Sequence, residues 1–218
     1  MKYAIDAVLF DMDGLMFDSE RLSDTAWRAV GPRFGVEVGP DEMALLRGTT
    51  REQGRINFKR RYGEGFPYDE AADEAWQLWD AMLEREVPVK RGLRELLAYL
   101  KQRGVKMAVA SSTPRRMVER NLAKAQVREW FDAVVCGDMV TRSKPDPEIF
   151  ETAARHLGVE PRRCLVLEDS YNGMRAGKAA GCVTVMVPDM DPATAEMRDI
   201  AAAILQNLAE VPAFLEQA

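Results

Sequence analysis

The chain has 218 residues, of which 47% are hydrophobic and 30% charged, and its formal net charge is −5. This length allows one large domain or a domain with a sizeable insertion, the apolar share is enough for a core, and the charged share argues against a disordered chain. The acidic balance excludes a global basic field for nucleic acid, so a negatively charged substrate would have to meet local positive charge.

The first predicted element is a buried strand at residues 7–11. In the stretch "VLFDMDG" it ends in Asp11, and Asp13 follows in the next loop. Two carboxylates directly after an apolar strand are costly to desolvate unless positive charge meets them. This stretch therefore predicts a functional site at the end of the first strand.

The segment after this strand contains helical patterns and no convincing strand. The predicted helices are residues 19–30, 41–46, 51–62 and 69–86. In the last of them Ala72, Trp76, Trp79 and Leu83 recur at helical spacing and predict a packed stripe. We expect residues 18–86 to form a small helical bundle, inserted into a core of residues 1–17 and 87–218. Two connections suit a cap that closes over a site.

Strands and helices alternate in the rest of the chain. Apolar runs predict strands at residues 105–112, 133–138, 164–169 and 182–187. Helical patterns separate them at residues 91–104, 114–127 and 146–158, with another in "GMRAGKA" after the fourth strand. This alternation predicts an α/β fold with a doubly wound, Rossmann-like parallel sheet. Ser170 and Asn172 are candidate caps of the fourth-strand helix, and Gly173 and Gly177 allow close packing on the sheet.

Cysteine and histidine usage argues against several kinds of site. Cys136, Cys164 and Cys182 form no C-x-x-C pair and are read as small buried residues. The single histidine, His156, lies opposite the apolar face of its predicted helix, so histidine-based catalysis is not expected. No run approaches the ~18 apolar residues of a membrane span, and no signal-peptide pattern is found. We expect a cytoplasmic protein without membrane or nucleic-acid partners.

Four segments deliver polar side chains to one edge of the predicted sheet, because ligands of such folds bind outside the carboxyl ends of the strands. These side chains are Asp11, Asp13, Ser111, Lys144, Glu168 and Asp169. Crowded carboxylates repel one another, and a bound Mg²⁺, which takes oxygen ligands and substrate phosphate, would resolve the repulsion. We therefore expect Mg²⁺ and Lys144 to meet the two aspartates of the first motif.

These residue types suggest phosphoryl chemistry. Asp11 can attack phosphorus as a nucleophile and form an aspartyl-phosphate. Asp13 can donate a proton to the leaving group and later accept one from water. Ser111 can hydrogen-bond a phosphoryl oxygen, and Lys144 offers a point charge.

Four motifs, "DMDG", "VASS", "SKPDPEIF" and "LEDSYNGMRAGKAAG", occur in this order and spacing. Together they resemble the haloacid dehalogenase-like hydrolase superfamily, in particular its branch of β-phosphoglucomutases and sugar-phosphate phosphatases. The resemblance implies a sheet order of 5-4-1-2-3. It also implies Mg²⁺ held by Asp11, the backbone carbonyl of Asp13 and Asp169, with Glu168 near the metal.

The resemblance also implies substrate-binding residues. Ser112 belongs to the "VASS" motif, and Gly48 and Arg51 belong to "LRGTTREQG", which resembles the substrate loop of the branch. Arg51 would contact the distal part of the substrate. A solvated basic helix face is the alternative reading, because Arg51 belongs to a basic run that continues to Arg60.

The expected activity is Mg²⁺-dependent hydrolysis of a small phosphomonoester, such as a sugar phosphate, by a monomeric enzyme. Dehalogenases of the superfamily typically lack the second aspartate. Mutases of the branch carry a histidine where Ser23 stands and a lysine–asparagine pair where Pro114 and Arg115 stand, which favours hydrolysis here. A β-phosphoglucomutase-like mutase remains the alternative, and a non-catalytic binding or regulatory protein is a further one.

Overall fold

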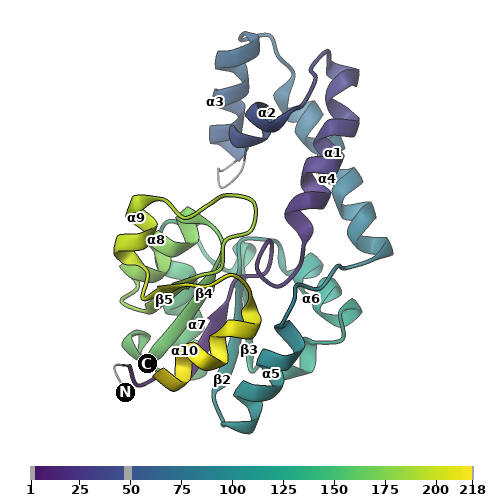
Figure 1. Ribbon diagram of the computed structural model, residues 1–218. Helices are drawn as coiled ribbons and strands as arrows, with labels where there is room; N and C mark the ends of the chain where they lie inside the picture. Colours follow the sequence, from purple (N-terminus) through teal and green to yellow (C-terminus); the bar gives the residue numbers. More distant parts are fainter. Residues whose placement is uncertain (1–2, 47–50, 218) are drawn as a thin grey trace. The chain divides into compact units, whose positions relative to one another are not determined.

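The computed structural model describes residues 3–46 and 51–217 (Figure 1). The chain divides into two compact units: Met1–Asp18 together with Val87–Ala218, and Ser19–Glu86. We call the first the core unit and the second the helical unit. Each is described by itself.

A parallel β-sheet forms the centre of the core unit. Its strands lie in the order β3-β2-β1-β4-β5-β6, and every neighbouring pair is parallel. The strands are β1 (Ala7–Phe10), β2 (Lys106–Ser111), β3 (Ala133–Cys136), β4 (Cys164–Glu168), β5 (Val183–Met186) and β6 (Ala203–Ile204). The predicted α/β fold is confirmed.

The predicted sheet order of 5-4-1-2-3 is right for five strands but omits the sixth. β6 has two residues and pairs with β5 through Val185↔Ala203 and Met186↔Ile204. So short a strand has no period of its own in the sequence, since it is defined by the neighbour that it pairs with. The sheet therefore extends one strand further at this edge.

Helices cover both faces of the sheet (Figure 1). They are α5 (Leu93–Gln102), α6 (Arg115–Lys124), α7 (Glu148–Leu157), α8 (Tyr171–Ala179), α9 (Ala195–Ile200) and α10 (Val211–Gln217). The connections between these helices and the strands contain four short 3-10 turns: η2 (Arg128–Trp130), η3 (Gly137–Met139), η4 (Pro161–Arg163) and η5 (Leu208–Glu210). Both faces are apolar, as the near-continuous apolar runs of the strands predict.

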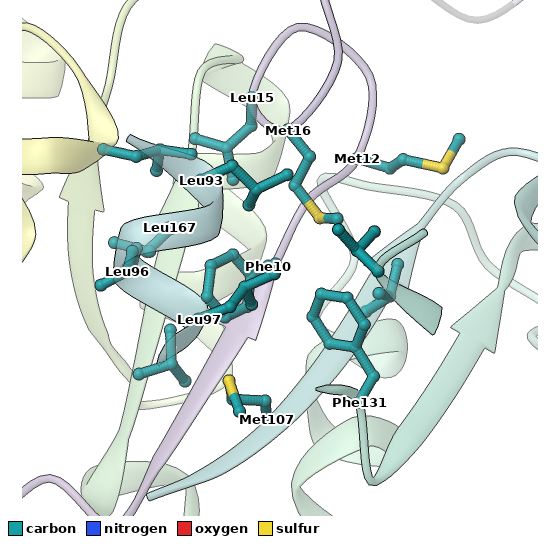
Figure 2. Packing of buried hydrophobic residues seen from close by; sticks show 14 of the residues in the cluster. Phe10, Met12, Leu15, Met16, Leu93, Leu96, Leu97, Met107, Phe131 and Leu167 are labelled. Atoms are coloured by element: carbon teal, nitrogen blue, oxygen red, sulfur yellow. The ribbon is translucent and has the colours of Figure 1, made fainter. Parts of the chain in front are cut away.

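Alternate residues of each strand point to opposite faces. Val8 and Phe10 belong to the cluster under α5, α6 and α10, whereas Ala7 and Leu9 belong to the cluster under α7 and α8. Figure 2 shows the first cluster, in which Phe10 lies among the leucines of α5. The Phe10 and Phe131 rings form a T-shaped pair with centroids 5.6 Å apart. Burying one such side chain stabilises the fold by about 1.5–3 kcal/mol.

The loop after β1 is itself part of this core. Met12, Leu15, Met16 and Phe17 are all fully buried, and three of them are labelled in Figure 2. Backbone bonds from the amides of Met16 and Phe17 to the carbonyl of Met12, at 2.9 and 3.1 Å, close it into a tight turn. The backbone around Asp13 is therefore held rigidly on the core.

The helical unit consists of α1 (Ser19–Val30), α2 (Pro40–Ala44), α3 (Arg51–Tyr62) and α4 (Tyr68–Arg85), with the 3-10 turn η1 (Gly31–Phe34). Its core centres on the fully buried Phe58, whose ring centroid lies 5.6 Å from that of Trp27 and 5.5 Å from that of Tyr68. The predicted stripe on α4 is wrong at Trp76, which is 43% exposed. The buried face instead runs through Ala71 and Ala75, one position earlier, because α1 packs there.

The remaining sequence predictions concern isolated residues. All three cysteines are free and buried, as predicted. His156 is exposed on α7, also as predicted. Within the described ranges, no helix combines the length and the hydropathy that a membrane span requires.

Candidate active site

The side chain of Lys144 joins two of the predicted site residues at the carboxyl edge of the sheet. Its Nζ donates to Asp11 Oδ1 at 2.5 Å and to Glu168 Oε1 at 2.6 Å, and also to the carbonyl of Ala110 at 3.0 Å. The ammonium lies 4.9 Å from the centroid of the Phe150 ring, within cation–π range. Strands β1, β2 and β4 thus meet at one buried ammonium group.

Burial and charge act in opposite directions on this cluster. Burial by itself would lower the pKa of Lys144, but the charges of Asp11 and Glu168 outweigh it and raise that pKa above its usual range. Burial raises the pKa of Asp11 to about 8, since attraction to Lys144 offsets only part of the desolvation and Glu168 adds repulsion. Burial and the neighbouring carboxylate thus disfavour charge on Asp11, whereas the two carboxylates favour charge on Lys144.

Glu168 is fully buried and both of its oxygens are bonded. Its Oε2 accepts from the amides of Asp169 at 3.1 Å and Ser170 at 3.0 Å, and from Ser170 Oγ at 2.9 Å. Ser170 also caps α8 by accepting from the amide of Gly173, which confirms its predicted capping role. The start of α8 therefore orients the carboxylate that holds Lys144.

Gly173 leaves no room for a side chain. A Cβ at this position would lie 1.7 Å from Glu168 Oε1, the oxygen that Lys144 binds. We expect Gly173→Ala to destabilise the protein by about 1–3 kcal/mol, because the carboxylate must shift in a packed interior. The direction of the change in unfolding free energy is informative, because replacing glycine by alanine inside a helix otherwise stabilises a protein by about 0.5–1 kcal/mol.

Urea denaturation of Gly173→Ala beside Gly65→Ala tests this prediction. At Gly65 a Cβ would meet nothing within 4 Å, so that variant should match the native protein. Equal unfolding midpoints for the two variants would show that Glu168 tolerates displacement.

Three carboxylates gather at this edge. Asp11, Glu168 and Asp169 each place an oxygen so that the three lie within 4.8 Å of one another. The ammonium of Lys144 pairs with two of them, Asp11 and Glu168. All three donors are carboxylate oxygens, the ligands that hard divalent cations prefer. The residues present therefore fit a magnesium ion.

The structure places Asp13 differently from the sequence-based expectation. Lys144 was expected to meet Asp11 and Asp13, but its two carboxylate partners are Asp11 and Glu168. Asp13 Oδ2 instead accepts a hydrogen bond of 2.7 Å from Thr113 Oγ1. Thr113 is not among the residues predicted from the sequence, and its place directly after Ser111 and Ser112 is the only signal there that could have indicated it.

The other predicted residues are placed as follows. Ser111 is buried at the end of β2, and its Oγ accepts from the amide of Thr113 at 3.1 Å. Ser112 is exposed in the same loop. Arg51, at the start of α3, pairs with Asp69 at 3.3 Å and Asp73 at 2.6 Å within the helical unit. Gly48 lies outside the described residues.

Glu148 organises the loop that leads to Lys144. Its Oε1 accepts from the amide of Thr141 at 3.0 Å, and its Oε2 accepts from Thr141 Oγ1 at 2.8 Å and the amide of Arg142 at 2.9 Å. The bond from the Thr141 amide is the largest of the causes that lower the pKa of Glu148 to about 2. The first turn of α7 thus holds residues 141 and 142, at the start of the loop that carries Lys144.

A stability difference that depends on pH follows for Glu148→Gln. A carboxyl whose folded pKa is lowered stabilises the fold above its ordinary pKa of 4.5 and loses that contribution as pH falls towards 2. The native protein should therefore be more stable than Glu148→Gln at pH 7, and the difference should shrink between about pH 4.5 and pH 2. Urea midpoints of both proteins across this range measure it. A difference that is constant with pH would contradict the prediction.

The chain matches the family model described as haloacid dehalogenase-like hydrolase over residues 5–181. Hexitol phosphatase B of Escherichia coli (strain K12) is 34% identical over 187 residues, which cover 84% of this chain and 83% of that protein. A crystal structure of CbbY from Rhodobacter sphaeroides in complex with xylulose-(1,5)bisphosphate matches at 30% identity with a TM-score of 0.78, covering 94% and 96% of the two chains.

A further solved structure extends the likeness of fold. β-Phosphoglucomutase from Clostridium difficile has a TM-score of 0.80 at 21% identity, with 98% of this chain and 96% of that chain covered. The resemblance that the four sequence motifs indicated is thus confirmed at the level of family and branch. The chain belongs to the haloacid dehalogenase-like hydrolases.

Proposed function

We propose that this hydrolase is a phosphatase, a phosphoric monoester hydrolase that uses Mg²⁺ and acts on a small phosphorylated metabolite of the sugar-phosphate class. One observation carries the proposal: the buried carboxylate of Asp11 is held by Lys144 and lies within a cluster of carboxylate oxygens. A nucleophile, fixed positive charge and room for a divalent cation are what phosphoryl transfer requires.

Each residue has a distinct role in the proposed reaction. A carboxylate oxygen of Asp11 attacks phosphorus, and the bond from phosphorus to the leaving oxygen breaks as an aspartyl-phosphate forms. Asp13 gives its proton to the leaving oxygen and then accepts a proton from the water that hydrolyses the aspartyl-phosphate. Lys144 keeps Asp11 oriented, and Ser111 hydrogen-bonds a phosphoryl oxygen.

Asp11, the backbone carbonyl of Asp13 and Asp169 would hold the magnesium ion. Glu168 holds Lys144 in place and lies near the metal site. Its oxygens already accept from Lys144, the amides of residues 169 and 170 and the Ser170 hydroxyl. Bound magnesium would neutralise negative charge on the phosphoryl group during transfer. The carboxylate oxygens of Asp11, Glu168 and Asp169, which lie within 4.8 Å of one another, support that assignment.

The substrate class rests on the relatives. One similar protein is named a hexitol phosphatase, and another was crystallised with a sugar bisphosphate. We propose that residues 18–86 act as a cap that selects the substrate, with Gly48, Arg51 and Ser112 as substrate-binding residues. Arg51 would have to exchange its bonds to Asp69 and Asp73 for substrate. The proposed enzyme is a cytoplasmic monomer.

Phosphate release from a panel of monoesters tests the proposal. The panel holds hexose 6-phosphates, hexitol phosphates, pentose 5-phosphates, glycerol phosphate, nucleoside monophosphates and p-nitrophenyl phosphate, each with Mg²⁺ and with EDTA. Release that requires Mg²⁺ and favours the sugar and polyol phosphates is the expected result. Preference for nucleotides would overturn the substrate class, and activity in EDTA would overturn the metal requirement.

The mutase alternative is examined in the same samples. If sugar-phosphate isomers interconvert without net release of phosphate, the activity is phosphoryl transfer between positions of a sugar and not hydrolysis. Absence of both reactions would return the protein to the non-catalytic reading.

A further inference from the structure

Thr113 links the proposed proton donor to the edge of the sheet. Its Oγ1 donates to Asp13 Oδ2 at 2.7 Å, across a separation of 100 residues in the chain. Both residues are half-buried. A short hydrogen bond from a neutral hydroxyl to a carboxylate oxygen is strong and directional, and so it restricts the rotation of the carboxyl group.

Thr113 is itself fixed by the backbone on two sides. Its amide donates to Ser111 Oγ at 3.1 Å, and its carbonyl accepts from the amide of Gly137 at 3.2 Å. Gly137 has to be a glycine here, because a Cβ would lie 2.0 Å from the carbonyl oxygen of Ser112. The Thr113 hydroxyl therefore projects from a segment clamped between the end of β2 and η3.

The backbone of Asp13 is equally constrained. It lies in the buried turn of residues 12–17, and its side chain is oriented at Oδ2 by a residue of a different strand loop. The hydrogen bond between Thr113 and Asp13 thus joins two segments whose backbones are both fixed. Such pre-organisation matters for proton transfer, since a donor must already point at the leaving oxygen when that oxygen gains charge.

We infer that Thr113 is a positioning residue for the reaction, which holds the carboxyl group of Asp13 in the orientation that protonates the leaving oxygen. The inference rests on the proposed phosphatase function. It deepens that function by adding a residue that acts through Asp13 and needs no contact with the substrate. The competing reading is that Thr113 only stabilises the loop after β2.

Leaving groups that differ in their need for a proton separate the two readings. An alkoxide leaving a sugar phosphate must be protonated, whereas p-nitrophenolate is stable at neutral pH and leaves without help. In Thr113→Val, kcat/KM should fall on the order of tenfold or more for the best alkyl phosphate of the panel, and less than about threefold for p-nitrophenyl phosphate. Because kcat/KM covers the steps up to loss of the leaving group, it includes this proton transfer and excludes the later hydrolysis of the aspartyl-phosphate.

Three further variants complete the experiment. Thr113→Ser keeps the hydroxyl and should recover most of the activity on the alkyl phosphate. Thr152→Val makes the same chemical change at a half-buried position of α7 and should behave as the native protein. In an Asp13→Asn background, Thr113→Val should add little further loss, because two residues that act as a unit are not additive.

Each outcome decides the inference. A loss selective for alkyl phosphates, with rescue by serine and no additivity with Asp13→Asn, supports it. Equal losses on both substrates, no rescue by serine, or full additivity would overturn it and leave the phosphatase proposal standing. If the native protein releases phosphate from no monoester, the proposed function fails, and the role of Thr113 fails with it.

Discussion

Lys144→Met is expected to reduce phosphatase activity by a factor of about 10²–10³, the usual cost of removing one preorganised charge from an active site. The same change should destabilise the protein by about 3–5 kcal/mol in EDTA, since it leaves the carboxylates of Asp11 and Glu168 buried without their ammonium partner. Phosphate release and urea denaturation measure the two effects separately.

Two comparisons make the Lys144 result specific. Lys101→Met, at an exposed position of α5, removes the same charge and should change neither quantity. Lys144→Arg keeps the charge but replaces a compact ammonium with a larger planar group, so it should also lose activity. An active, fully stable Lys144→Met protein would mean that the negative charge of Asp11 and Glu168 is neutralised by another group.

Asp11→Asn is expected to abolish turnover, with a loss on the order of 10⁴-fold or more, because an amide cannot serve as the nucleophile. Its effect on stability should be opposite to that of Lys144→Met. Removing one of the clustered carboxylates lowers the mutual repulsion, and Lys144 keeps its bond to Glu168. We expect the urea midpoint in EDTA to be unchanged or higher.

The matched control for this variant is Asp199→Asn, at an exposed position of α9. It should retain native activity on every substrate of the panel. Phosphate release by Asp11→Asn within tenfold of the native rate would contradict covalent catalysis through Asp11. The nucleophile would then have to be another carboxylate of the cluster.

Much of the site was predictable because it is built from short local signals. Asp11 and Glu168 follow apolar runs, and the parallel arrangement of β1 and β4 brings the ends of those runs together. Ser170 was recognisable as a helix cap, since capping depends on residues within one turn. Gly173 was recognisable as a site of close packing, although the atom that it approaches was not.

Other features depended on partners distant in the chain. Trp76 and Ala75 both fit an apolar helix face, and only the packing of α1 on α4 decides which of them is buried. Arg51 belongs to a basic run in the sequence, but its carboxylate partners come from a different helix. Neither the buried face of α4 nor the ion-pair partners of Arg51 can be read from the local periodicity of the sequence.

The sequence by itself determined five strands of the sheet, the helices that alternate with them, and which residue types meet at the carboxyl edge of the sheet. It could do so because strand period, helix period and capping are properties of a few consecutive residues. The tertiary structure alone decided that Lys144 bridges Asp11 and Glu168, that Thr113 holds Asp13, and that a sixth strand extends the sheet. Each of these depends on the distance between atoms far apart in the chain, which is set by how the elements pack.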